Sequence, residues 1–149
     1  ITFQQPNTIS EIASHSGVQS VVVSVDVKKN IWGKYNIYSN DGTKKQDYDL
    51  VEWVQELEKL GAGEILLTSM DRDGTWSGFD LAMIIKVTDA VSIPVIANGG
   101  AGNVEDIGKV VREANASAVA LGSMVVYQQK GLGVLVNFPD KDNLNRILK

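Results

Sequence analysis

Cysteine is absent from the 149 residues of the sequence, and the only histidine is His15. A chain without cysteine forms neither disulfides nor thiolate metal sites, and this composition fits a cytoplasmic protein. A single histidine argues against a histidine-based metal centre and against a Ser-His-Asp triad. We therefore expect a cytoplasmic protein that uses neither a metal nor another cofactor.

Long apolar runs and an excess of positive charge are also missing. No stretch reaches 18 apolar residues, so no helix is expected to span a membrane. The start, ITFQQPNTIS, lacks the basic residues and the apolar core of a signal peptide. The net charge of −4 and the lack of a basic run argue against nucleic acid. We expect neither nucleic acid nor a membrane as a partner. The sequence lacks an initial methionine and starts in what looks like a strand, which is typical of a fragment. A natural short form is the alternative.

The sequence alternates between two kinds of segment. Four short runs rich in valine and isoleucine, without polar alternation, predict strands buried on both faces; they cover residues 20–26, 64–69, 93–98 and 117–123. Segments with helical spacing of apolar residues lie between them; they cover residues 49–60, 80–90 and 103–114, with a shorter helix through 11–16 after Pro6. This alternation predicts one α/β domain built on a parallel sheet.

The connection after the first predicted strand is unusually long. Its segment KYNIYSNDGTKK contains an Asn-Asp-Gly turn signal, which predicts a small antiparallel hairpin projecting from the sheet. The three tryptophans, Trp32, Trp53 and Trp76, are predicted to be packing residues. Trp76 has a second interpretation, because its loop carries polar residues and its ring could cover a substrate.

Polar residues follow each apolar run at its carboxyl end. Since parallel strands end at one edge of a sheet, these residues should converge although they are scattered in sequence. They are Asp26 and Lys28, then Thr68, Asp71 and Asp73, then Asn98 and the glycine-rich residues 99–102, then Gly122 and Ser123.

The segment NGGAGN before a predicted helix is a candidate phosphate site. Glycines allow the backbone to approach an anion, and a helix amino terminus offers free N–H groups. A plain strand-to-helix turn explains the motif equally well. The second glycine loop, at Gly122, favours the phosphate site, because barrels commonly bind phosphate with two neighbouring loops near the end of the chain.

The carboxylates at this edge also have two interpretations each. Asp26, at a strand end, can act as a general acid or base, or it can form a salt bridge with Lys28 or Lys29. Asp71 and Arg72 can pair with each other, and Asp73 can belong to a simple turn.

Three stretches, VVVSVDVKK, GAGEILLTSMDRDGTWSGFD and IPVIANGGAG, resemble the carboxyl-terminal part of the cyclase subunit of imidazole glycerol phosphate synthase. The resemblance implies a (β/α)₈ TIM barrel of which this chain is roughly the second half. Residues 1–149 would form a single half-barrel domain, from the tail of strand four (ITF) to the eighth unit. With a glutaminase partner, that family makes the imidazole ring of histidine from a phosphoribosyl-formimino nucleotide and ammonia.

The resemblance also assigns roles to residues. It implies that Asp26 is catalytic and that Glu64 belongs to a charged ring at the ammonia entrance. It implies that Thr68 and Asp73 bind the substrate and that Gly99, Gly100 and Ser123 bind phosphate. Their places at strand ends and in the glycine loops add Lys28 and Asn98 to the expected substrate-binding residues, and Ala101 and Gly122 to the expected phosphate-binding residues.

Two departures keep alternatives open. The second catalytic aspartate of the family lies on a first strand that this chain lacks. The ending YQQKGLGVLVNFPDKDNLNRILK resembles a branch found with surface-polysaccharide (lipopolysaccharide) genes, which is thought to supply ammonia for an acetamidino group on a sugar. A non-catalytic half-barrel that binds phosphate is the alternative from another class. A generic phosphate-binding barrel, such as a sugar isomerase, fits the DRDGT loop less well.

A half-barrel should also self-associate into a homodimer or larger homo-oligomer. Its inner face would carry Val21, Val23, Leu66, Val95 or their neighbours, which the other half of a barrel normally covers.

Overall fold

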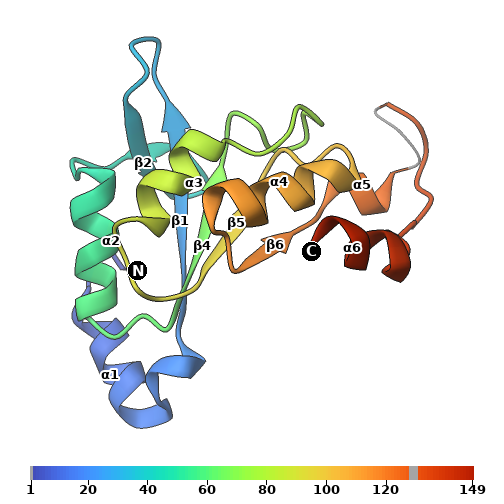
Figure 1. The fold of residues 1–149 in the computed structure, drawn as a ribbon. Helices are drawn as coiled ribbons and strands as arrows, with labels where there is room; N and C mark the ends of the chain where they lie inside the picture. The colour runs from blue at the N-terminus through green and yellow to red at the C-terminus, as the bar shows by residue number, and fades with distance from the viewer. Residues whose placement is uncertain (1, 128–130) are drawn as a thin grey trace.

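The structure is a computed structural model that describes residues 2–127 and 131–149. Its centre is a sheet in the order β3-β2-β1-β4-β5-β6 (Figure 1). Four strands are parallel to one another; they are β1 (Val22–Lys29), β4 (Glu64–Ser69), β5 (Val95–Asn98) and β6 (Ala118–Ala120). The predicted α/β class and parallel sheet are confirmed.

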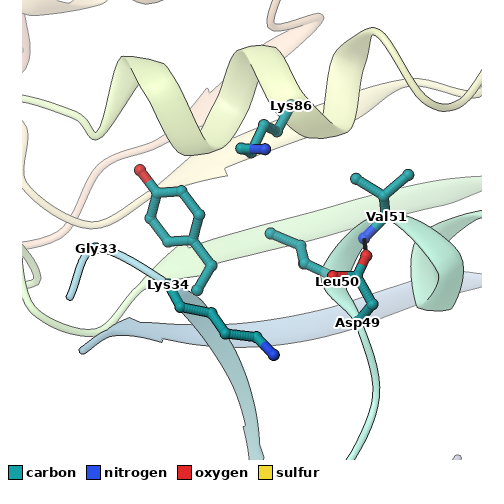
Figure 2. Close-up of a pocket in the computed structure, with 7 residues that line it drawn as sticks. Gly33, Lys34, Asp49, Leu50, Val51 and Lys86 are labelled. Carbon is teal, nitrogen blue, oxygen red and sulfur yellow. Dashed lines mark hydrogen bonds between the residues drawn. The ribbon is translucent and has the colours of Figure 1, made fainter.

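Helices follow the strands as the sequence patterns predict. Those described are α1 (Asn7–Ser16), the 3₁₀ helix η1 (Val18–Ser20), α2 (Leu50–Lys59), α3 (Leu81–Thr88), α4 (Val104–Ala114), α5 (Ser123–Val126) and α6 (Lys141–Ile147). Side-chain caps fix where α2, α3 and α4 begin: Asp49 accepts from the amide of Val51 in α2 (Figure 2), Asp80 caps α3 and Asn103 caps α4. Such caps satisfy amides that the helix itself cannot bond.

Only one face of the sheet is covered by helices. In β4, Ile65 and Leu67 are fully buried, whereas Leu66 between them is only half-buried. Helices α2, α3 and α4 pack over the buried face (Figure 1). The expectation of strands buried on both faces is therefore wrong, because the described residues supply one layer of helices and nothing to cover the other face.

We call the second face the uncovered face; it carries Val22, Ser24, Asp26, Lys28, Glu64, Leu66, Thr68, Ile96 and Asn98. Val21, Val23 and Val95 were expected there but belong to the buried core instead. Their neighbours Val22 and Ile96 take that position, since successive side chains of a strand point to opposite faces.

The predicted hairpin is present and is part of the sheet. β2 (Tyr35–Ser39) pairs antiparallel with the second half of β1, and β3 (Lys44–Lys45) pairs antiparallel with β2. The intervening turn uses left-handed backbone at Asn40 and Asp41, with φ of 52° and 54°. The turn between β1 and β2 projects beyond the end of the sheet at the top of Figure 1.

Some predicted boundaries were wrong. Residues 2–4 form a turn rather than the tail of a strand, and Ile1 lies outside the described residues. The first strand begins at Val22 because Ser20 belongs to η1. β5 begins only after Pro94, which has no N–H to donate to a neighbouring strand. Ser123, expected to end a strand, begins α5.

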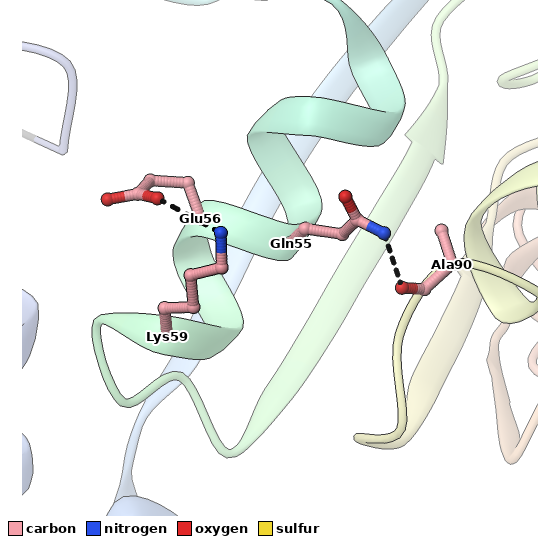
Figure 3. A network of polar contacts seen from close by, with 4 residues as sticks. All are labelled: Gln55, Glu56, Lys59 and Ala90. Atoms are coloured by element: carbon pink, nitrogen blue, oxygen red, sulfur yellow. Dashed lines mark hydrogen bonds and ion pairs between the residues drawn. The ribbon is translucent and has the colours of Figure 1, made fainter.

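The helical layer is tied together by a few polar contacts. The side chain of Gln55 in α2 donates to the carbonyl of Ala90, just after α3, at 3.2 Å (Figure 3). Lys59 and Glu56 form an ion pair of 3.9 Å with side chains 73% and 52% exposed, and such a pair adds little stability. Trp53 of the same helix is buried and stacks on Phe3, which confirms its predicted packing role.

Candidate functional site

Three polar side chains of the uncovered face lie in one register across the sheet. Asp26 of β1 is opposite Thr68 of β4, and Thr68 is opposite Asn98 of β5. The amide of Asn98 donates to the hydroxyl of Thr68 at 3.2 Å. Because neighbouring strands are about 4.8 Å apart, this polar row spans about 10 Å. All three residues are half-buried.

The residues below the polar row are less polar. Ser24, Leu66, Ile96 and Ala118 form the next register, one pleat toward the amino ends of the strands. The predicted convergence of polar groups therefore holds for the carboxyl ends of the strands. Lys28 lies on the same face as Asp26, two residues further along β1, and is exposed.

A small hollow, which we call the glycine hollow, lies beside the polar row. It is lined by Asp73, Gly74, Asn98, Gly99, Gly100, Ala101, Ala120, Gly122 and Ser123. The structure thus brings together all five predicted phosphate-binding residues and two of the predicted substrate-binding residues. Glu64 is not among them, since it begins β4 at the opposite end of the strand, as predicted.

Two glycines are required for the shape of this hollow. Gly99 and Gly100 have φ of 90° and 112°, which side-chain-bearing residues rarely adopt. A Cβ at Gly100 would lie 2.3 Å from the carbonyl of Gly78, and the amide of Gly78 donates to the carbonyl of Gly100 at 2.8 Å. The glycine-rich loop is therefore docked directly on the loop that carries Asp73.

The amino terminus of α4 is less open than expected. Its capping box directs the carboxylate of Asp106 onto the amides of Gly102 and Asn103, at 3.0 and 3.2 Å. The described residues provide no hydrogen-bond acceptor for the amides of Gly100 and Ala101. The amides of Gly100 and Ala101, which line the glycine hollow, are therefore available to an anion, whereas Asp106 occupies those of Gly102 and Asn103.

Other contacts settle the alternatives for the neighbouring charges. Asp71 accepts from the amide of Lys29 at 2.6 Å, and Arg72 donates to the carbonyls of Ser77 and Gly78 at 3.0 and 3.2 Å. Asp71 and Arg72 therefore do not pair with each other. Among the described residues Asp26 forms no ion pair, which leaves its carboxylate without the salt bridge considered from the sequence.

No sequence pattern indicated the buried contact that joins the hairpin to α3. The hydroxyl of Tyr35 in β2 donates to the carboxylate of Asp80 at 3.0 Å, and Asp80 also accepts from the amide of Met83. Burial, followed by the hydrogen bond to Asp80, raises the pKa of Tyr35 to about 12. A tyrosine at the start of a strand is common, so the sequence alone does not mark Tyr35 as special. Only its contact with Asp80 in the folded structure does so.

A parallel sheet with strand–helix alternation, helices on one face and polar residues at the carboxyl ends of its strands defines part of a (β/α)₈ barrel. The chain belongs to the histidine biosynthesis protein family, whose family model matches residues 1–131.

Individual relatives agree with the family match. The chain is 39% identical over 148 residues to a protein of Vibrio vulnificus (strain YJ016) provisionally named imidazole glycerol phosphate synthase subunit hisF3. It is 47% identical over 124 residues to imidazole glycerol phosphate synthase subunit HisF of Prosthecochloris aestuarii (strain DSM 271 / SK 413). These matches cover 99% and 83% of this chain but 57% and 49% of the relatives. The chain therefore spans about half the length of the curated relatives it matches.

Proposed function

We propose that this chain supplies the second-half residues of an ammonia-using cyclase of the imidazole glycerol phosphate synthase type. The observation that carries the proposal is the polar row, Asp26, Thr68 and Asn98, beside the glycine hollow on the face that would line a barrel. The substrate would be a phosphoribosyl-formimino nucleotide, whose phosphate suits the glycine hollow. The whole range 1–149 would act as one half-barrel domain.

Each residue has a role in this proposal. The carboxylate of Asp26 exchanges protons with the reacting nitrogen as a general acid or base. Thr68 and Asn98 fix polar groups of the substrate, with Lys28 and Asp73 above them. The free amides of Gly100 and Ala101 bind the phosphate, together with the loop at Gly122 and Ser123.

The rest of the active site would come from the other half of the barrel. It would contribute the second catalytic carboxylate and a second phosphate site. A glutaminase subunit would supply ammonia at the opposite end of the strands, where Glu64 lies at the start of β4. We place this pair of subunits in the cytoplasm, as the cysteine-free sequence predicts.

The test is turnover of the formimino nucleotide by the full gene product with ammonium salt, and then with a glutaminase and glutamine. Formation of the imidazole product in both arms supports the proposal. Binding of inorganic phosphate without any turnover would instead favour a non-catalytic half-barrel.

A second candidate function is that of the family branch found with surface-polysaccharide genes. In that case the protein would supply ammonia for an acetamidino group on a sugar. The family model ends at residue 131, whereas the 148-residue match to the Vibrio protein must include residues beyond it. The carboxyl-terminal ending is therefore shared with the Vibrio protein, and what favours this candidate is the resemblance of that ending to the surface-polysaccharide branch. This candidate would be favoured if the protein does not cyclise the nucleotide but supports ammonia-dependent conversion of an acetamido sugar to the acetamidino sugar.

A further inference from the structure

The turn between β1 and β2 exposes two large apolar side chains side by side. Ile31 is 88% exposed and Trp32 is 84% exposed, the highest values among large apolar side chains in the described residues. The prediction that Trp32 packs in the interior is therefore wrong. Residues 30–34, which we call the hairpin tip, project beyond the sheet, away from the other elements that the structure describes (Figure 1).

The hairpin tip is held in one conformation by hydrogen bonds. The side-chain oxygen of Asn30 accepts from the amides of Trp32 and Lys34 at 3.0 and 2.8 Å. The amide of Gly33 donates to the carbonyl of Asn30 at 2.9 Å, with Gly33 at φ of 83°. Ile31 and Trp32 are thus presented on a preformed turn, and little backbone ordering is left for a binding partner to impose.

Positive charge surrounds these apolar side chains. The segment KKNIWGK contains three lysines and no acidic residue, in a chain whose net charge is −4. Lys28 and Lys29 point to opposite faces of the hairpin, and the ammonium of Lys29 lies 5.2 Å from the ring centre of Tyr35. Lys34 lies on the returning strand, and Figure 2 shows it bordering the same hollow as Lys86. Asp71 touches this hairpin only at its base, through the amide of Lys29.

We propose that the hairpin tip is a peripheral anchor for an anionic lipid bilayer. Trp32 and Ile31 enter the interface between headgroups and acyl chains, where tryptophan is favoured, and Lys29 and Lys34 contact anionic headgroups. A projecting tip reaches a flat surface end-on, which a residue within the sheet cannot do.

A protein partner fits the same feature less well. A stable protein interface needs about 800 Å² from each side, contributed by 20 or more residues. The hairpin tip offers five residues, whereas a fluid bilayer needs no matching shape. None of the helices formed by the described residues has both the length and the apolarity to cross a bilayer, so the anchor is peripheral. The sequence-based expectation of no membrane partner considered only spanning segments.

The experiment is cosedimentation of the full gene product with vesicles of phosphatidylcholine alone or mixed with phosphatidylglycerol. We expect binding to the anionic vesicles only, and weaker binding as salt is raised. The double variant I31S/W32S should lower the binding constant at least tenfold, and K34Q about fivefold. These side chains are exposed, so folding should be unaffected, which circular dichroism checks.

The matched control is V136S/F138S, which changes two exposed apolar side chains, 62% and 72% exposed, in a segment without charge. It should bind the anionic vesicles as the unmodified protein does. Three results would overturn the proposal: no binding of the unmodified protein, equal binding by I31S/W32S, or an equal loss in the control. A hairpin tip that instead binds a purified protein partner, and no vesicle, would overturn it as well.

Discussion

Asp26 lies in the second half of β1, in register with Thr68, and has no ion-pair partner among the described residues. If it exchanges protons with the substrate, Asp26→Asn in a complete barrel should lower turnover about a hundredfold or more while leaving the fold intact. The substitution keeps size and polarity but removes the titrating group. Steady-state kinetics at saturating ammonia, with circular dichroism for folding, checks this expectation.

A control for this variant is Asp89→Asn, which removes an exposed carboxylate at the end of α3, outside the polar row and the glycine hollow. Its turnover should equal that of the unmodified enzyme. If Asp26→Asn is equally active, Asp26 has only a structural role.

Gly100 is constrained by both conformation and space. Gly100→Ala would place a methyl group 2.3 Å from the carbonyl of Gly78 at a φ of 112°. We expect a loss of about 1 to 3 kcal/mol in the free energy of unfolding, because such backbone is strained for any residue with a Cβ. Phosphate binding, followed by calorimetry, should weaken as well, since the loop must shift away from the loop that carries Asp73.

The matched substitution is Gly122→Ala in the second glycine loop. An added Cβ there meets nothing within 4 Å, and φ is −109°. Its unfolding free energy in a urea titration should stay close to that of the unmodified protein. If both substitutions destabilise the protein equally, the close approach to Gly78 does not explain why glycine is needed at position 100.

At the scale of elements, the hydrogen bond between Tyr35 and Asp80 joins the hairpin to the start of α3. Tyr35→Phe should lower the free energy of unfolding by about 1 to 3 kcal/mol, because a buried carboxylate loses a donor. Asp80 keeps its bond to the amide of Met83, so the cap of α3 should survive. Tyr38→Phe, in the same strand and half-buried, serves as the control and should change little.

The same contact predicts a dependence on alkaline pH. Because the pKa of Tyr35 is raised from 10.0 to about 12, the folded chain holds this proton at pH values where the unfolded chain releases it. The stabilisation is therefore complete below pH 10 and is lost as pH rises toward 12. Urea titrations across this range should show a steeper fall for the unmodified protein than for Tyr35→Phe. Identical slopes would contradict the assignment.

At the scale of the whole molecule, the uncovered face determines how the 149-residue polypeptide behaves when expressed by itself. Val22 is 53% exposed, Leu66 and Ile96 are half-buried, and the first half of β1 has a free edge beside them in the described residues. Apolar surface beside an unpaired strand favours association. We expect sedimentation at micromolar concentration to show a dimer or larger species, and a stable 16.1 kDa monomer would contradict this.

The variant Leu66→Glu should shift that polypeptide toward the monomer, because a charge would lie at the centre of the uncovered face. Ile85→Glu is its control, since Ile85 is an exposed apolar residue of α3 on the helical side. An equal effect of both variants would show that association does not use the uncovered face.

Much of the fold was predictable from local patterns. The bounds of β4 matched the apolar run at residues 64–69, and two predicted helical segments began at Asp49 and Asn103, which cap α2 and α4 in the structure. These features depend on residues a few positions apart, so the sequence displays them directly. Boundaries failed where a neighbouring element decided them, as at Ser20 and Ser123, which joined short helices.

The candidate site, like the fold, was predicted in part from local patterns and in part only from the tertiary structure. Strand ends and glycine motifs identified all the residues of the glycine hollow except Gly74 and Ala120, because parallel strands bring their carboxyl ends to one edge. The closure of the α4 terminus by Asp106 and the contact of Tyr35 with Asp80 were not predicted. Both depend on which side chain reaches which atom after packing, and periodicity contains no such information.

Local propensity and the geometry of parallel strands were enough to predict the order of strands and helices and the polar residues at strand ends. Only the tertiary structure decided which face of the sheet is buried, since that depends on whether a second layer is present to cover it. It also decided that Trp32 is exposed while Trp53 is buried. Both residues are tryptophan, so hydrophobicity does not distinguish them. Trp32 lies on a projecting turn, whereas Trp53 lies in α2 and stacks on Phe3.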